Sequence, residues 1–502
     1  MECILSSITF LPLAGAILIL FVPKEKERFV RWAAVLASGL SFLASLSLLK
    51  DFDRAQAAMQ FTEKVAWIPY FNINYSLGVD GLSVPLVVLT TLLSLLSIIG
   101  SFGIEKRVKE YFFWFLVLET GMLGVFVALD FFLFYIFWEI MLVPMYFLIG
   151  IWGGPQKEYA AIKFFLYTLF GSVFMLIAIL ALYFKAGRTF DILQLTAMNA
   201  QFTGAFAIVA FLFLFIAFAI KVPIFPFHTW LPLAHVEAPT AVSVILAGVL
   251  LKLGTYGMMR ISFPMFPEVA LKFAVPLLVL AFINIIYGAL CAMSQKDMKK
   301  MVAYSSINHM GYALLGMAAF TTTGFNGAIL QMVNHGIITG SLFLLVGVVY
   351  DRAHTRDLDA FGGLGARLPV YTGIMVLACM ASLGLPGLAG FISEFLCFMG
   401  SFSSTASPYR VFESVPVYKF FTALSVIGIL VTAAFFLKLI QKVFLGTLNE
   451  KWKDMKDMTA TELVAVVPLT VLTVVIGVWP HWLIRLSDAT VQSMKFLVDV
   501  VK

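Results

Sequence analysis

The stretch that decides the fold is residues 221–252, KVPIFPFHTWLPLAHVEAPTAVSVILAGVLLK, which is largely apolar and has a lysine at each end. Lys221 closes a charge-free hydrophobic run, and Lys252 lies in the middle of the next one. Pro223 and Pro226 prevent a regular helix directly after Lys221. A broken helix beside a charge, inside an apolar segment, is typical of an ion pathway through a membrane.

The whole chain has the composition of a membrane protein. Of its 502 residues, 61% are hydrophobic and 12% are charged, against roughly 25% charged in soluble domains, and the mean hydropathy is +0.97. So few charges cannot cover the surface of a soluble fold. The net charge of +6 comes from scattered loop residues and not from a basic cluster, so we expect no nucleic-acid partner.

Apolar stretches long enough to cross a bilayer recur along the chain. A hydrocarbon core about 30 Å thick needs roughly 20 helical residues. Such stretches lie near residues 3–22, 30–49, 82–103, 111–129, 131–150, 161–184, 205–222, 241–260, 272–293, 301–319, 326–350, 370–402, 418–440 and 462–482. Apolar residues run all round these segments, whereas the strands of a membrane β-barrel would alternate apolar and polar residues, so helices are implied. We predict an all-α, polytopic membrane protein with about 14 transmembrane helices.

The connections between these segments indicate the orientation. Odd-numbered connections carry twice as many Lys and Arg residues as even-numbered ones, and the basic side normally faces the cytoplasm. Both termini are therefore expected on the outer side, and the first segment is expected to be a retained helix and not a cleaved signal peptide. The polar connection 50–81 predicts a short outer hairpin. The residues after Trp482 predict an amphipathic helix at the membrane surface or against a partner.

Four charged residues lie where charges are expensive. Glu139, Lys221 and Lys252 fall within apolar segments, and Glu394 follows the sequence ASLGLPGLAGFIS. Each costs about 2.5–3.5 kcal/mol at a helix centre. Buried ion pairs often fail to repay desolvation, so stability alone is a poor reason to keep four. We interpret the four as a charge relay. Glu119 could instead simply bond a neighbouring helix.

A second break supports this interpretation. Gly384-LPGLAGF contains Pro386, Gly387 and Gly390, which loosen the backbone about as far from the first break as the helix near residue 272 lies from the helix near 111. Such spacing predicts a structural repeat with one broken helix in each half. Irregular backbone at membrane depth is tolerated only inside protein or beside water, so we expect a hydrated path there.

The histidines suit such a path. His309 and His335 lie in residues 301–350, which contain no Asp, Glu, Lys or Arg, while His228 and His235 lie near the first break. Each could relay protons near neutral pH or could be a neutral packing residue. The sequence has no phosphate-binding glycine loop and no metal-binding spacing of His or Cys, so we expect no metal and no redox chemistry on this chain.

An ordered set of motifs resembles a known family. The run from Lys221 to Lys252 is similar to the antiporter-like M-subunit family of bacterial respiratory complex I, NADH-quinone oxidoreductase. The resemblance extends through FYIFWEIMLVPMYFLIGIW (134–152), AYSSINHMG (303–311), HTRDLDAFGGL (354–364) and GLPGLAGFISEF (384–395). It covers essentially the whole chain. Leu233 departs from it, since many members of the family have Asp there.

The resemblance implies fourteen helices with two inverted five-helix repeats, in which helices seven and twelve are discontinuous. It implies four regions: residues 1–110, the repeats 111–260 and 261–445, and a last helix with an amphipathic tail, 446–502. The implied proton relay is Glu139, Lys221, Lys252 and Glu394, supported by His228, His309 and His335. Glu139 would pair with Lys221, Lys252 would be the central proton acceptor, and Glu394 would be the exit-side carboxylate.

The resemblance also implies partners and location. It places the chain in the bacterial inner membrane beside the antiporter-like L and N subunits, with NADH, FMN, iron–sulfur clusters and quinone held by other subunits. The closest alternative is a subunit of a cation/proton antiporter or of a membrane-bound hydrogenase, which shares the charged axis. A solute transporter would need a more varied polar pocket, and a passive scaffold would not need charges beside broken helices.

Overall fold

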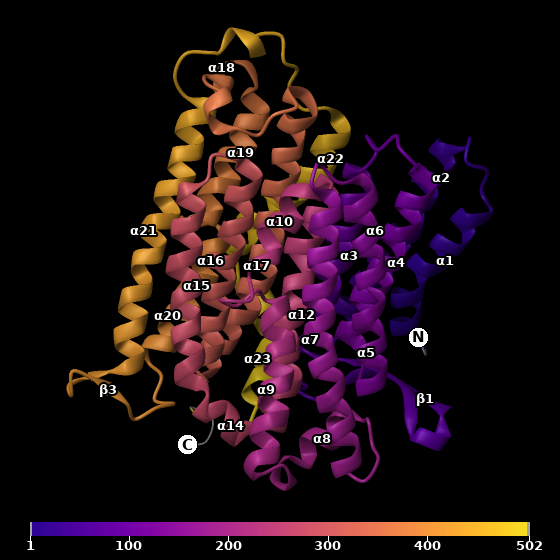
Figure 1. The fold of residues 1–502 in the computed structure, drawn as a ribbon, viewed down its shortest axis with the longest axis vertical. Helices are drawn as coiled ribbons and strands as arrows, with labels where there is room; N and C mark the ends of the chain where they lie inside the picture. The colour runs from indigo at the N-terminus through magenta and orange to yellow at the C-terminus, as the bar shows by residue number, and fades with distance from the viewer. Residues whose placement is uncertain (1–2, 499–502) are drawn as a thin grey trace.

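The computed structural model describes residues 3–498, which form a bundle of long helices (Figure 1). Twelve helical segments in this range are long and apolar enough to span a membrane. They are α1 (Ile4–Phe21), α2 (Glu27–Asp51), α3 (Ser83–Gly100), α4 (Val108–Val127), α5 with α6 (Phe131–Ile140 and Leu142–Trp152), α7 (Lys157–Lys185), α9 (Gly204–Lys221), the segment from α11 to α13 (Thr240–Met265), α15 (Ala274–Ser294), α17 (Thr322–Ala353), α21 (Val417–Phe444) and α22 (Ala460–Val478).

Two further segments bring the described part of the chain to the fourteen that the sequence predicts. One is α16 (Met298–Ala318), which is less apolar, and the other is the interrupted pair α19 (Pro369–Ser382) and α20 (Ala389–Phe402). The shorter helices are α8 (Ile192–Ala197), α10 (Trp230–Glu237), α14 (Pro267–Lys272), α18 (Leu364–Arg367), α23 (His481–Gln492), η1 (Pro69–Phe71), η2 (Asn199–Gln201), η5 (Leu358–Ala360) and η6 (Glu450–Trp452).

The α11-to-α13 segment is not one regular helix. It alternates α-helical and π-helical turns: α11 (Thr240–Ile245), η3 (Leu246–Leu250), α12 (Leu251–Gly257), η4 (Met258–Ser262) and α13 (Phe263–Met265), of which η3 and η4 are π-helical. Single π turns inside α-helices occur frequently at functional sites. Here the first of them directly precedes α12, the helix that carries Lys252.

The predicted hairpin in the connection 50–81 is confirmed. Strands β1 (Gln60–Ile68) and β2 (Ile73–Val79) pair antiparallel, and a second small pair, β3 (Arg410–Val411) with β4 (Val415–Pro416), follows α20. The Glu63 carboxylate accepts hydrogen bonds from the backbone nitrogens of Leu5 at 2.8 Å and Ser6 at 3.2 Å. The hairpin is thereby anchored to the start of α1, at the same end of the molecule as α8 (Figure 1).

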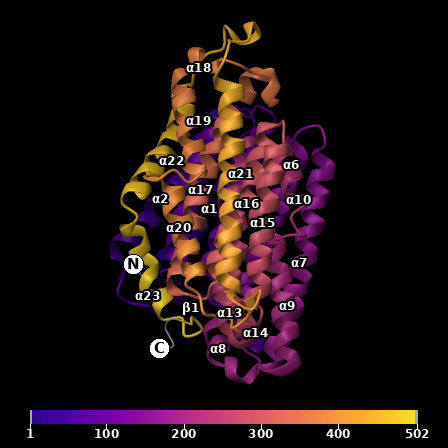
Figure 2. The ribbon, with the colours of Figure 1, turned by 90° about the vertical axis from the view of Figure 1, so that its left-hand side faces the viewer.

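Helix α17 lies at the centre of the bundle. Its most apolar window is wholly buried, as is that of the α11-to-α13 segment. It packs against α16, α20, α22 and α11. In Figure 1, α17 lies between α21 at one side of the molecule and α1 and α2 at the other, and Figure 2, the turned view, shows α21 on the side that faces the viewer. The helix that carries His335 is therefore shielded from lipid.

The interpretation of the C-terminal tail as a membrane-surface or partner contact is wrong for the residues that the structure describes. Helix α23 packs against α17 and α3 of the same chain, and it buries Leu483, Leu486 and Val491. Asn326 of α17 donates a hydrogen bond to Asp488 at 3.0 Å. The apolar face of the tail is thus used internally. Val501 and Asp499, which also entered the interpretation, lie outside the described residues.

The close approach of α12 to α9 yields a stability prediction. A Cβ on Gly254 would lie 2.5 Å from the carbonyl oxygen of Phe218 and 3.1 Å from the backbone nitrogen of Val222. Because both contacts are backbone, Gly254→Ala forces the helices apart, and we expect a loss of about 1–3 kcal/mol. Thermal unfolding of the purified complex measures it. Gly373→Ala, whose Cβ meets no atom within 4 Å, is the control; an equal melting temperature for both variants would contradict the prediction.

Candidate functional site

The first helix break is held by side chains from neighbouring helices. Helix α9 ends at Lys221, and α10 begins nine residues later at Trp230. Asn284 of α15 donates to the Pro223 carbonyl at 3.2 Å and accepts from the Phe225 nitrogen at 2.8 Å. Trp230 donates from its indole nitrogen to the Ile220 carbonyl at 3.0 Å. Irregular backbone at membrane depth needs such partners, so these contacts allow the break.

Lys221 stands at the edge of this break, and within residues 3–498 its ammonium has no hydrogen-bond partner. Its side chain is buried, and its ammonium nitrogen lies 5.1 Å from the ring centroid of Trp138 and 5.8 Å from that of Phe164. A desolvated cation–π contact is worth about 2 kcal/mol. Glu139 interacts with Lys221 electrostatically, but among the described residues the two form no ion pair. Glu139 and Lys221, which the resemblance implies as partners, are therefore neighbours whose charged groups are not in contact; we call this the open arrangement.

Lys252 lies in a second group of polar residues. Its ammonium nitrogen is 2.6 Å from Nδ1 of His335 and donates to the Ala247 carbonyl at 2.5 Å. Ala247 lies in the π turn η3, where the backbone departs from the α-helical bonding pattern. The Lys252 side chain is fully buried. A π turn has no simple signature in this apolar stretch, so the sequence did not indicate this carbonyl partner.

The second group continues through the two remaining predicted residues. The ring of His335 lies 5.9 Å from the ring of His309. Nδ1 of His309 is 3.2 Å from the Glu394 carboxylate, and its Nε2 is 2.9 Å from the Ser382 hydroxyl. Helices α12, α17, α16 and α20 thus place Lys252, His335, His309 and Glu394 in one buried row. A small cavity borders both histidines and Glu394.

Three polar residues beside this row were missed by sequence reasoning. Ser393 donates to the side-chain oxygen of Gln331 at 2.6 Å, and Gln331 donates to the His309 carbonyl at 3.2 Å. Asn334 donates to the Ala389 carbonyl at 2.6 Å, at the start of α20. Gln331 and Asn334 could have been found from the sequence, because residues 331, 334 and 335 share one face of a predicted helix in a charge-free segment.

His228 lies beside α15, after the first break. Its Nε2 is 3.3 Å from the Tyr287 hydroxyl, and its ring stacks on Phe225 at 5.7 Å. In residues 3–498 it makes no hydrogen bond to Lys221, Lys252 or His335. The turn after Pro226 thus places His228 beside Tyr287 of α15, and its role in the axis stays a prediction.

Glu119 and the four cysteines lie outside this row. Glu119 is fully buried and accepts a hydrogen bond from Ser38 of α2 at 3.0 Å, which is the neighbouring-helix contact considered above. Cys379 and Cys397 are buried, Cys291 is half-buried and Cys3 is exposed, all as free thiols. Over the described range, no cluster of three His, Cys, Asp or Glu residues is placed to hold a metal ion.

Comparison with known proteins assigns the fold to a family. The model described as "NADH:quinone oxidoreductase/Mrp antiporter, TM" matches residues 128–417, and "NADH-ubiquinone oxidoreductase chain 4, amino terminus" matches residues 9–127. NADH-quinone oxidoreductase subunit M of Rhodobacter capsulatus is 46% identical over 510 residues, which cover 98% of this chain and 96% of that protein. The chain belongs to the subunit M family of NADH-quinone oxidoreductase.

Solved structures agree with this family. A chain of respiratory complex I from Thermus thermophilus matches with a TM-score of 0.86 at 30% identity, covering 98% of this chain and 99% of that one. A chain of the Mrp complex from Dietzia has a TM-score of 0.82 at 23% identity and is covered over 51% of its length. The second likeness shows the shared fold alone. Identity over nearly full length favours the complex I family over the antiporter alternative.

The two hydrogen bonds by which Asn284 holds the first break give a stability prediction. Asn284→Leu leaves the Pro223 carbonyl and the Phe225 nitrogen without their side-chain partner, and each unsatisfied buried group costs about 1–3 kcal/mol. We expect a lower melting temperature for the assembled complex. Leu290→Ala, on the exposed face of the same helix, is the control. Equal melting temperatures for the two variants would show that the break does not need the hydrogen bonds from Asn284.

Proposed function

We propose that this chain translocates protons as a membrane-arm subunit of NADH-quinone oxidoreductase, with Lys252 as its central proton acceptor. The observation that supports this function is the buried row from Lys252 through His335 and His309 to Glu394. Every member of the row can gain and lose a proton. Their desolvation makes the row a poor source of stability, so a transport role explains it better than packing does.

The open arrangement of Glu139 and Lys221 suggests how transfer is driven. When the two approach, the carboxylate stabilises the lysine ammonium; when they separate, Lys221 releases its proton toward Lys252 more readily. A charged Lys221 in turn repels a proton on Lys252 toward Glu394. Moving one charge against 100 mV requires about 2.3 kcal/mol. That energy comes from electron transfer between NADH and quinone, through the FMN and iron–sulfur clusters of other subunits.

We also propose the division into regions 1–110, 111–260, 261–445 and 446–502. Two matching pairs of aspartates support the repeat. Asp130 caps α5 and forms a β-bridge with Asp191, while Asp297 caps α16 and bridges Asp357. The breaks at Lys221 and before α20 follow these pairs in the same order. Each half thus presents one broken helix to the interior.

The proposed setting is the bacterial inner membrane, with both termini on the outer side. Membership in a multi-subunit membrane complex follows from the family, and the proposed neighbours are the antiporter-like L and N subunits. The excess of Lys and Arg in the odd-numbered connections supports the orientation. Exposed apolar side chains on α1, α7 and α21, such as Leu18, Phe170 and Leu430, face lipid or these neighbours.

The first functional prediction concerns Lys252→Met, which keeps the length of the side chain and removes its proton. In inverted membrane vesicles energised with NADH, we expect proton uptake per NADH oxidised to fall at least about tenfold. Lys438→Met is the matched control, since Lys438 donates to the Met293 carbonyl at a helix end, away from the buried row. Normal uptake by the Lys252 variant would refute the proposed function.

The second functional prediction concerns the coupling pair. Glu139→Gln and Lys221→Met should each lower proton uptake severalfold, and the double variant should be no worse than Lys221→Met, because interacting residues are not additive. The same vesicles measure it, with assembly checked on native gels. Losses that simply add for the two sites would contradict coupling between Glu139 and Lys221.

A further inference from the structure

A series of side-chain hydrogen bonds connects helices α16, α17 and α20 beside the buried row. Asn334 of α17 donates to the Ser393 hydroxyl of α20 at 3.1 Å, and Ser393 donates to the side-chain oxygen of Gln331 at 2.6 Å. Gln331 in turn donates to the His309 carbonyl of α16 at 3.2 Å. A carbonyl oxygen can only accept, so this bond also fixes which end of the amide faces Ser393. We call these three hydrogen bonds the Gln331 link.

The Gln331 link is attached directly beside two groups of the proposed relay. Ser393 immediately precedes Glu394 in α20. The carbonyl that Gln331 binds is that of His309 itself. Gln331 also lines the small cavity that borders His309 and Glu394. A movement of α20 that separates Glu394 from His309 would therefore stretch or break the link.

The separation of His309 from Glu394 is at the upper limit for proton transfer. Nδ1 of His309 lies 3.2 Å from the Glu394 carboxylate, and direct transfer needs about 2.6–3.2 Å between the heavy atoms. A misplacement of about 1 Å can cost about 100-fold in the rate of a reaction step. A small shift of α20 against α16 is therefore enough to slow transfer between these two residues.

Gln331 is a costly residue if it only fills space. It is buried, and an amide is unfavourable in an apolar interior unless it is hydrogen-bonded. The His309 carbonyl lies inside α16, where the backbone amide four residues later is its regular partner. The Ser393 hydroxyl has a second acceptor, the Gly390 carbonyl of its own helix at 3.1 Å. Neither group needs Gln331, so packing alone would favour an apolar side chain at this position.

We propose that Gln331 is a positioning residue, which holds Glu394 within transfer distance of His309 through the Gln331 link. The inference rests on the proposed function, because it names the side chain that sets the geometry of the same row. Gln331 exchanges no proton itself, since its amide does not titrate. Without the link, α20 can move relative to α16, and the hydrogen bond between His309 and Glu394 lengthens or is lost.

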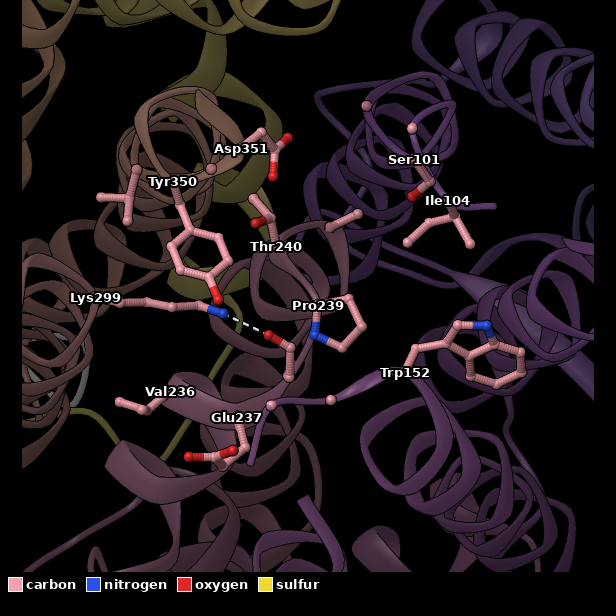
Figure 3. A pocket seen from close by; sticks show the side chains of 18 of the residues that line it. Ser101, Ile104, Trp152, Val236, Glu237, Pro239, Thr240, Lys299, Tyr350 and Asp351 are labelled. Atoms are coloured by element: carbon pink, nitrogen blue, oxygen red, sulfur yellow. Dashed lines mark hydrogen bonds between the residues drawn. The ribbon is translucent and has the colours of Figure 1, made fainter. Parts of the chain in front are cut away.

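Helix α16 is held at other points, so a variant that lacks the link should still assemble. Asp297 caps the first turn of α16. Lys299, which lines the pocket drawn in Figure 3, donates from its ammonium to the Ala238 carbonyl just before α11. Further along α16, Asn308 donates to the Ile285 carbonyl of α15 at 2.7 Å. The loss of one more bond to this helix is thus a local change.

The test compares Gln331→Leu with Asn326→Leu in the whole complex. Both variants remove a buried amide from α17, but Asn326 bonds to Asp488 and Ser487 of α23, away from the row. In inverted vesicles energised with NADH, we expect Gln331→Leu to lower proton uptake per NADH oxidised at least about threefold. We expect Asn326→Leu to leave this ratio unchanged, whatever it does to the melting temperature.

A second readout separates positioning from stability. The carboxyl stretching band of Glu394, identified by infrared difference spectroscopy from its absence in Glu394→Gln, reports the hydrogen bonding of that group. We expect the band to shift in Gln331→Leu and in Ser393→Ala, which breaks the same link, and to keep its position in Asn326→Leu. Normal uptake by Gln331→Leu, or an unshifted band in it, would overturn the inference. If Gln331→Leu fails to assemble, Ser393→Ala decides by the same two measurements.

Lys252→Met in the same vesicles separates the two proposals. If that variant takes up protons normally, the proposed function itself fails. If it is defective while Gln331→Leu is normal, the function stands and Gln331 has no positioning role. If both are defective, the Glu394 band shifts in Gln331→Leu and Asn326→Leu is normal, both proposals hold.

Discussion

The backbone N–H and C=O groups at a helix break cannot be left without hydrogen bonds in hydrocarbon, and this constraint shapes the interior of the bundle. Each of the two breaks is satisfied by an asparagine from another helix: Asn284 holds the turn after Lys221, and Asn334 reaches the Ala389 carbonyl at the start of α20. Side chains that satisfy a break also make its surroundings polar. Charged residues can therefore lie beside the breaks, deep in the membrane, at a lower cost than in a uniform apolar core.

Features with a local or compositional cause were predictable from the sequence. The number of spanning segments follows from apolar length, the hairpin from the polar connection at 50–81, and both breaks from their prolines and glycines. Lys252 and Glu394 could be selected as site residues because a charge in an apolar segment is visible without knowing its neighbours. The structure brings these two into one row with both predicted histidines of α16 and α17.

Features that depend on how distant helices cross were not predictable. His228 turns toward Tyr287 and away from the row, because the path of the chain after Pro226 sets its direction. The π turn before Lys252, which presents the Ala247 carbonyl, arises within a stretch whose composition suits a plain helix. The sequence of the C-terminal tail predicts an amphipathic helix at the membrane surface or against a partner, yet α17 and α3 cover its apolar side. Periodicity shows that a face is apolar, but not what covers it.

Proton transfer along the row from Lys252 requires Glu394 to take up and release a proton during turnover. Infrared difference spectroscopy of the whole complex, comparing the resting state with steady NADH oxidation, tests it most directly. We expect a change in the stretching band of a protonated carboxyl group that disappears in Glu394→Gln and persists in Glu119→Gln. The same spectral change in the Glu394 variant, or no carboxyl change in the unmodified complex, would contradict it.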